Sequence, residues 1–217
     1  MELLQNTIFI NLESRKDRLK NVQEELTKIG VVGERFNDIQ TKNGAVGCSM
    51  SHIKCLEMAK ERGYEQVFIC EDDISFTNPS LFLENIQKFY ENEDEILWDV
   101  LITGGNVCPP HIVVTDYCSR VLNCQTTLGY IVKKEYYDTL LLNFKQGLTN
   151  LIRNPANHRE FAIDIYWKKL QMQDYWYIIT PLTVSQRPDY SDVEKRNVDY
   201  NRLMLDIEKT WLRPVPR

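Results

Sequence analysis

The stretch FICEDDISF, residues 68–76, places three adjacent carboxylates at the end of an apolar run. The run QVFIC (66–70) is short and almost wholly apolar, which is typical of a central strand buried on both faces of a parallel sheet. Three neighbouring carboxylates repel one another, and this raises a pKa unless a cation or solvent relieves the repulsion. The alternative is a plain acidic strand exit, in which one carboxylate caps the next segment.

The positions of these carboxylates indicate a metal site. Successive side chains of an extended chain alternate, so Glu71 and Asp73 would aim at one point while Asp72 points elsewhere. Ligands that are all oxygen favour a hard ion, Mg²⁺ or Mn²⁺, completed by phosphate oxygens and water. The stretch therefore predicts a metal–phosphate site held by Glu71 and Asp73.

Strand-like and helix-like patterns alternate through the first half of the chain. Apolar runs predict four strands: TIFINL (7–12), GERFNDI (33–39), QVFIC (66–70) and WDVLIT (98–103), the last ended by Gly104 and Gly105. Between them we expect three helices: one capped by Ser14 and stopped at Gly30, one capped by Ser49 or Ser51 and ended at Gly63, and one opened by Pro79. This rhythm predicts an α/β fold with a mixed, mainly parallel central sheet flanked by helices.

The second half of the chain is less regular. It contains expected short strands with a hairpin in HIVVTD, SRVLNC and TLGYIV, helices near 134–145 and 161–172, the strand YWYIITP (175–181), and a tail from Gln186 with a helix near 198–211. Ligands of parallel sheets bind at the carboxyl ends of the strands. Residues 11–18, 71–73 and 104–106 are therefore predicted to converge on one rim.

Composition narrows the class of protein. The 217 residues suit one domain, and 43% hydrophobic with 26% charged residues indicates a globular chain. The net charge of −5 with scattered Lys and Arg argues against a nucleic-acid partner. No run is long enough to span a membrane, the first residues show no secretory signal, and the six cysteines are expected to be free thiols. We therefore expect a cytoplasmic protein.

Three segments resemble glycosyltransferase family 25, which includes lipopolysaccharide and collagen glycosyltransferases and related viral enzymes. They are FINLESRKDRLKNVQEELTKIG, GAVGCSMSHIKCLEMAKERGYEQVFICEDDISF and WDVLITGG. They contain the family's INL…R…R opening, its GxxGCxxSH segment, and an EDD that stands in for DxD. The resemblance covers residues 7 to about 105 and, more loosely, extends to about 195. It implies a single GT-A-like (Rossmann-like) domain over 1–217, with a nucleotide-sugar half (about 1–106) and an acceptor half (about 107–217).

The resemblance also implies roles for individual residues. For the UDP-sugar donor it indicates Asn11, Arg15, Arg18, Gly47, Ser51, His52, Asp72, Gly104, Gly105, Thr126 and Tyr130. For Mn²⁺ or Mg²⁺ it indicates Glu71 and Asp73, completed by Gln186, Asp189, Asp192 or water, and for the catalytic base it indicates Asp164. Structural alternatives stay open: a solvated helix face for the two arginines, a buried structural role for His52, a turn or core role for Thr126 and Tyr130, and a helix cap for Asp164.

Two other uses of the GCxxSH segment are weaker. Cys48 and His52 stand four residues apart, which would place a thiol and an imidazole on one helix face, but catalytic Cys–His pairs normally come from distant elements. Together with Cys55 they also resemble zinc ligands, but no CxxC pair or fourth ligand is evident. Neither use is favoured by the sequence.

The expected function is that of a metal-dependent inverting glycosyltransferase. It would move galactose or glucose from a UDP-sugar to a hydroxyl of a glycan or protein acceptor, and a lipid-linked acceptor would bring peripheral membrane association. A homodimer, and a viral origin with a host-cytoplasm or virion location, are left open. The alternatives are a catalytically inactive nucleotide-sugar or carbohydrate-binding relative and another metal–phosphate transferase, although no GxxxxGK[ST] loop occurs.

Overall fold

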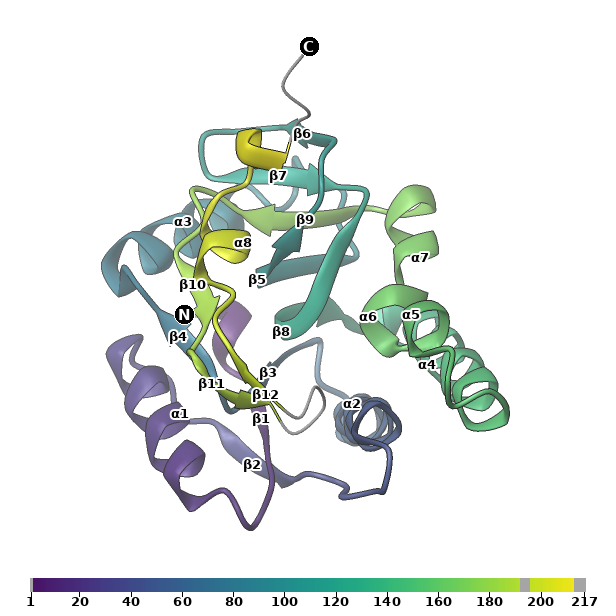
Figure 1. Cartoon of the computed structure of the whole chain (residues 1–217). Coiled ribbons are helices and arrows are strands. Elements are labelled where there is room, and N and C mark those ends of the chain that lie inside the picture. Colours follow the sequence, from purple (N-terminus) through teal and green to yellow (C-terminus); the bar gives the residue numbers. More distant parts are fainter. Residues whose placement is uncertain (1, 192–195, 213–217) are drawn as a thin grey trace.

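The computed structural model describes residues 2–191 and 196–212 (Figure 1). Within them lies an eight-stranded sheet with the order β2-β1-β3-β8-β5-β9-β7-β6. Its strands are β1 (Thr7–Asn11), β2 (Glu34–Asn37), β3 (Gln66–Glu71), β5 (Val100–Val107), β6 (His111–Val113), β7 (Cys118–Val121), β8 (Cys124–Lys133) and β9 (Trp176–Ile179).

The sheet is mixed, and most of its strands share one direction. β1 pairs in parallel with β2 and β3, and β5 pairs in parallel with β9. The long β8 runs antiparallel between β3 and β5, so β2, β1, β3, β5 and β9 all point the same way. The expected hairpin is formed by β6 and β7. The predicted α/β class with a mixed, mainly parallel central sheet is confirmed.

Helices cover both faces of the sheet. The larger ones are α1 (Lys16–Lys28), α2 (Gly44–Glu61), α3 (Pro79–Glu91) and α4 (Tyr137–Arg153); the short ones are α5 (His158–Phe161), α6 (Ile163–Tyr166), α7 (Lys168–Gln173) and α8 (Asn201–Leu205). In Figure 1, α1 and α3 lie to the left of the sheet and α2 and α4 to the right. Two small antiparallel pairs, β4 (Ile74–Phe76) with β10 (Val184–Gln186) and β11 (Asp189–Ser191) with β12 (Arg196–Val198), lie outside the main sheet.

The alternation of side chains along β1 explains these layers. Ile8 and Ile10 belong to a core cluster shared with α2 and α4, whereas Phe9 belongs to the cluster shared with α1 and α3. Because successive residues of a strand face opposite sides, a strand covered on both sides must be apolar throughout. The buried run that precedes Glu71 follows the same rule, and it ends where the sheet ends.

Two predicted helix starts are wrong. α1 has Arg15, not Ser14, as its N-cap residue, with no hydrogen bond from the side chain. α2 begins at Gly44, because the Asn43 side chain accepts a hydrogen bond from the Ala45 N–H at 3.1 Å. Asn is among the best N-cap residues, and it outcompetes the serines expected to cap the helix. His52 consequently lies in the interior of α2, away from the helix N-terminus.

Other boundaries also differ from the prediction. β5 continues through the two glycines expected to end it, with irregular pairing to β8 at that point. The helix expected over 161–172 is interrupted between α6 and α7, and the tail forms short strands before the brief α8. All six cysteines are free thiols, as expected. Among the helices in the described residues, none has the length and apolarity that a membrane span requires.

Candidate active site

A cleft of about 940 Å³ opens at the carboxyl ends of β1 and β3. The chain segment after β1 supplies two arginines to its lining, the end of β3 supplies the three carboxylates, and the end of β10 supplies an amide. The polar and charged lining side chains include Arg15, Arg18, Asp38, Cys48, His52, Glu71, Asp72, Asp73 and Gln186. The predicted convergence on one rim is therefore confirmed for residues 11–18 and 71–73, but residues 104–106 do not line this cleft, and Asn106 lines the second cleft beside it.

Asp72 and Asp73 share one cation. Arg18 Nη1 lies 3.1 Å from Asp72 Oδ1 and 3.2 Å from Asp73 Oδ2. The expectation that Asp72 points away from its neighbours is wrong, because the chain turns immediately after Glu71, at the end of β3, and strand alternation no longer applies there. Burial raises the pKa of Asp72, although Asn11 and Arg18 oppose the rise.

Asp73 is the least compensated of the three carboxylates. Its side chain is buried, and its Oδ2 accepts a 2.6 Å hydrogen bond from Gln186 Nε2. Its Oδ1 is buried with no hydrogen-bond partner among the described residues. Burial, followed by the nearby charge of Glu71, raises the pKa of Asp73 to about 7. A buried oxygen in this state is a ready ligand for a cation.

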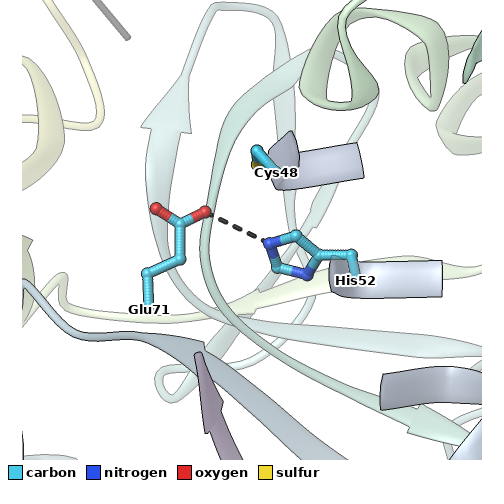
Figure 2. Close-up of side chains that lie close together, drawn as sticks. All are labelled: Cys48, His52 and Glu71. Atoms are coloured by element: carbon cyan, nitrogen blue, oxygen red, sulfur yellow. Dashed lines mark hydrogen bonds and ion pairs between the residues drawn. The ribbon is translucent and has the colours of Figure 1, made fainter. Parts of the chain in front are cut away.

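Glu71 faces a different set of partners. Its Oε1 lies 3.3 Å from His52 Nε2 (Figure 2). The same oxygen accepts a 2.5 Å hydrogen bond from Thr127 Oγ1. Burial alone would raise the pKa of Glu71, but the hydrogen bonds from His52 and Thr127 bring it below its ordinary value. β8 begins at the same rim because it runs antiparallel to β3, and this brings Thr127 to the carboxylate.

The two arginines are held by the C-terminal part of the chain. Arg15 Nη2 and Arg18 Nε lie 2.6 and 3.0 Å from the same oxygen of Asp189, in β11. Arg18 also donates to the Tyr190 carbonyl at 2.8 Å. Both guanidinium groups line the cleft, so the alternative of a solvated helix face is wrong. Asp192, the other acidic candidate of this segment, lies outside the described residues.

Asn11 fixes the orientation of Asp72 by a hydrogen bond. Its Nδ2 donates to Asp72 Oδ2 at 2.7 Å, and its Oδ1 accepts from Arg35 Nε at 3.0 Å. The side chain is buried, so its contacts are with the protein. Arg35 was not predicted as a site residue; it lies in the first half of the strand expected from GERFNDI, a position that gives no sign of a contact with Asn11.

A second cleft, of about 920 Å³, lies beside the first. The two clefts share the lining residues Cys48, Glu71, Gln186 and Ser191. The second cleft is otherwise lined by uncharged side chains, polar and apolar, and by one further carboxylate, Asp164.

Asp164 faces this second cleft, in the short α6. Its Oδ2 accepts a 3.1 Å hydrogen bond from the backbone N–H of Thr126. Burial raises the pKa of Asp164, and that hydrogen bond opposes the rise. The N-cap residue of α6 is Ala162, so the alternative of a helix-capping Asp164 is wrong. A half-buried carboxylate with a raised pKa is suited to accepting a proton.

Thr126 has an unusual backbone conformation. Its φ is +75°, in the left-handed region that a β-branched residue rarely adopts. Such strain persists only where the surrounding structure imposes it, and it is concentrated at functional sites. Here it aims the Thr126 N–H at Asp164 and into the second cleft.

Several expected donor contacts lie elsewhere in the structure. Tyr130 is fully buried below His52, and Ser51 is buried and donates to Asp38. At Gly47, Gly104 and Gly105 a Cβ would meet other parts of the chain: the Ile39 carbonyl oxygen at 2.3 Å, Val184 Cγ1 at 2.7 Å and Cys124 Sγ at 2.6 Å, respectively. These five residues support the fold around the clefts, because packing accounts for the close approaches that the glycines permit.

The donor set at the first cleft fits a hard divalent ion. The partnerless Asp73 Oδ1 is an oxygen ligand, and Glu71 is close enough to raise the pKa of Asp73. Gln186, bonded to Asp73, adds an amide oxygen, the kind of ligand that such ions accept. Glu71, Asp73 and Gln186 are the described residues that would hold the ion.

The likeness to one solved structure supports the fold. The structure of A197 from STIV is 15% identical, with a TM-score of 0.52, and the match covers 89% of this chain and 93% of that chain. Two further similar structures are a glycosyltransferase involved in the glycosylation of the major capsid of PBCV-1 (9% identity, TM-score 0.46, 81% and 93% covered) and the mannose-1-phosphate geranyltransferase of Thermus thermophilus (9%, 0.45, 81% and 73%). At 15% identity the likeness to A197 concerns the fold alone.

The sequence comparisons give the family. None of the curated proteins compared with the chain matches it. The family model described as glycosyltransferase family 25 (LPS biosynthesis protein) matches residues 41–153, which include the GCxxSH segment and the three carboxylates. That match spans just over half of the chain, so the chain belongs to glycosyltransferase family 25.

Proposed function

We propose that this glycosyltransferase is a metal-dependent, inverting enzyme that moves galactose or glucose from a UDP-sugar to a hydroxyl of a glycan or protein. The observation that carries the proposal is the division of labour between two adjoining clefts. One gathers carboxylates and arginines around a buried oxygen of Asp73 that has no hydrogen-bond partner among the described residues, and the other is lined mainly by uncharged side chains, with Asp164 as the carboxylate that the first cleft does not share. Diphosphate and acceptor would bind in these two places.

In the first cleft the chain would hold the donor's diphosphate. Glu71 and Asp73, with Gln186, would hold Mn²⁺ or Mg²⁺, which supplies positive charge to the departing diphosphate. Arg15 and Arg18 line the same cleft, and guanidinium groups pair well with phosphate oxygens. Asp72 is tied to Asn11 and Arg18, so we assign it the positioning of Arg18.

In the second cleft Asp164 would act as the base. The acceptor hydroxyl oxygen attacks the anomeric carbon, its proton passes to Asp164, and the bond from that carbon to the diphosphate oxygen breaks on the opposite side. The Thr126 N–H holds the carboxylate for this transfer. The pKa of Asp164, raised by burial, brings its proton affinity closer to neutral pH than that of an exposed carboxylate.

A panel of UDP-sugars with Mn²⁺, read by UDP release and thermal shift, tests the proposal. We expect one UDP-hexose to give UDP release. This release should require the divalent ion, and it should be faster when a hydroxyl acceptor is present. UDP release that is independent of metal for every donor, or the absence of any release, would overturn it.

One observation favours a second candidate, a catalytically inactive nucleotide-sugar-binding relative. Arg18 already places positive charge between Asp72 and Asp73, and such compensation makes an ion less necessary. This candidate predicts a thermal shift with a UDP-sugar but no UDP release. The same panel therefore separates the two functions.

The proposal also covers the acceptor, the oligomeric state and the cellular location of the enzyme. A glycan or protein hydroxyl is the expected acceptor, and nucleic acid is not expected as a partner because the basic residues are scattered and the net charge is −5. A lipid-linked acceptor would bring the enzyme to a membrane surface, and cytoplasmic location and a homodimer remain predictions.

A further inference from the structure

Cys48, His52 and Glu71 come together between the two clefts (Figure 2). One ligand atom from each, the Cys48 Sγ, a His52 ring nitrogen and a Glu71 carboxylate oxygen, lie within 4.8 Å of one another. Cys48 and His52 are four residues apart in α2 and share one face of that helix, while Glu71 arrives from the end of β3. The sequence could not supply this third ligand, because it comes from a different element.

We propose that Cys48, His52 and Glu71 bind a thiophilic divalent ion of the Zn²⁺ type. The three donors are a sulfur, an imidazole nitrogen and a carboxylate oxygen, which is a ligand set that zinc accepts and that Mn²⁺ and Mg²⁺ do not favour. In a tetrahedral zinc site neighbouring ligand atoms lie roughly 3.5 Å apart, so no pair of ligand atoms in the trio needs to approach by more than about 1.3 Å. The proposal therefore requires the Cys48 and Glu71 side chains to move towards His52 when the ion binds.

The His52 ring is already held in a suitable orientation. Its Nδ1 lies 3.0 Å from the Tyr130 hydroxyl, which leaves Nε2 directed at Glu71. In the metal-free protein the hydrogen bond to Glu71 places the ring proton on Nε2. A tyrosine hydroxyl can accept as well as donate, so on metal binding it can accept from Nδ1–H, which frees the Nε2 lone pair for the ion. The Tyr130 ring packs edge-to-face against the Trp167 ring, with the two ring centroids 5.7 Å apart, and this contact holds it in place. Such second contacts to a metal-binding histidine fix its orientation and raise its affinity for the ion.

The proposed site is open to solvent on one side. Cys48 and Glu71 line both clefts, and His52 lines the first. A fourth position can therefore be filled by water or by a ligand in either cleft, as in zinc sites with three protein ligands. Burial, then the charge of Glu71, raises the pKa of the Cys48 thiol, so the metal-free protein keeps the S–H bond. Binding would form the metal–sulfur bond and release that proton to solvent.

This inference goes beyond the proposed transfer reaction and has one consequence for it. Glu71 belongs to both ligand sets, so a zinc ion on Cys48 and His52 would remove a ligand from the Mn²⁺ site. Zinc would then inhibit the enzyme by competing for a carboxylate and not for the donor. Only this consequence depends on the proposed function.

Titration of the reduced, metal-free full chain with Co²⁺, in the absence of donor, tests the site. Thiolate-bound tetrahedral Co²⁺ gives a sulfur-to-metal charge-transfer absorption that oxygen ligands do not give. We expect one saturable absorption, displaced by Zn²⁺, absent from Cys48→Ser and retained in the matched control Cys108→Ser, which also replaces a partly exposed thiol. Glu71→Gln should weaken Co²⁺ binding about tenfold or more.

A second measurement works on the unaltered protein. Zn²⁺ should slow the alkylation of Cys48 by iodoacetamide, mapped by mass spectrometry, and leave the alkylation rate of Cys108 unchanged. The proposal is overturned if the charge-transfer absorption is absent from the wild type or persists in Cys48→Ser, or if Zn²⁺ protects the two thiols equally. Because neither experiment uses a UDP-sugar, such a failure would not bear on the transfer reaction.

Discussion

The negative charges of the carboxylates are balanced in different ways in the two clefts. In the first, Asp72 and Asp73 share Arg18, which Asp189 also binds, so several charges balance one another. In the second, Asp164 accepts a hydrogen bond from the backbone N–H of Thr126, has no arginine among the residues that line the cleft, and shares the cleft mainly with uncharged side chains. The difference indicates that the first cleft suits a multiply charged ligand and that the second suits a neutral hydroxyl next to a proton acceptor.

The largest expected effect is that of Asp164→Asn. The amide keeps the size of the side chain but cannot take a proton, so turnover should fall about 10²- to 10⁴-fold, the usual contribution of a general base. Donor affinity should change little, since the two clefts have different tasks. Steady-state kinetics with the active UDP-sugar and an isothermal titration of UDP measure the two quantities. Equal losses of turnover and of UDP affinity would contradict the division between the clefts.

Asp73→Asn should lower turnover about 10²- to 10³-fold, the scale of losing one electrostatic stabiliser of the transition state. Unlike Asp164→Asn, it should also weaken the dependence of turnover on Mn²⁺ concentration. A melting curve serves as the control, and we expect the variant to melt at the same temperature as the wild type or above, because a repelled, buried carboxylate has been neutralised. A folded variant with unchanged activity would refute the assignment of Asp73.

The stability of the metal-free protein should fall as the pH rises towards 7. The pKa of Asp73 is raised from 3.8 to about 7 in the folded state, so the folded protein binds the proton more tightly than the unfolded chain does. That contribution is complete below about pH 4 and is lost as the pH rises through about 7, by a few kcal/mol at most. Urea unfolding in EDTA at several pH values, compared between the wild type and Asp73→Asn, isolates it. Identical pH slopes in the two proteins would rule this effect out.

The smallest effect concerns the strained residue of the second cleft. Thr126→Gly keeps the N–H that binds Asp164 and removes the cost of a positive φ, about 1–3 kcal/mol. Against this gain, glycine loses more conformational entropy on folding than threonine does, which lowers stability. We expect a net stabilisation of about 1 kcal/mol, measured by denaturant unfolding. A loss of stability would mean that the Thr126 side chain contributes more than its backbone costs.

Much of the fold could be predicted because its signals are local. The buried runs at 66–70 and 98–103 and the glycine stop at Gly30 are properties of short segments, and the structure retains them. The position of Glu71, Asp72 and Asp73 at the edge of the sheet could also be predicted, because they come directly after a buried strand. Helix starts were less predictable, since Asn43 competes with nearby serines for the same role.

The pairing of side chains within the site could not be predicted, because it depends on segments far apart in sequence. Thr127 reaches Glu71 only because β8 is inserted antiparallel beside β3, and Asp189 reaches Arg15 and Arg18 from the opposite end of the chain. For the same reason, the packing roles that the structure shows for Tyr130 and for the two glycines of β5 differ from the donor contacts that we expected. Their surroundings come from elements that the local pattern does not contain.

The most direct test of the account is the affinity for UDP with and without Mn²⁺, measured by isothermal titration calorimetry. If Glu71 and Asp73 grip an ion that holds the diphosphate, Mn²⁺ should strengthen UDP binding at least about tenfold in the wild type, and Asp73→Asn should lose most of that gain. Equal UDP affinity in Mn²⁺ and in EDTA, or an undiminished gain in Asp73→Asn, would contradict the claim.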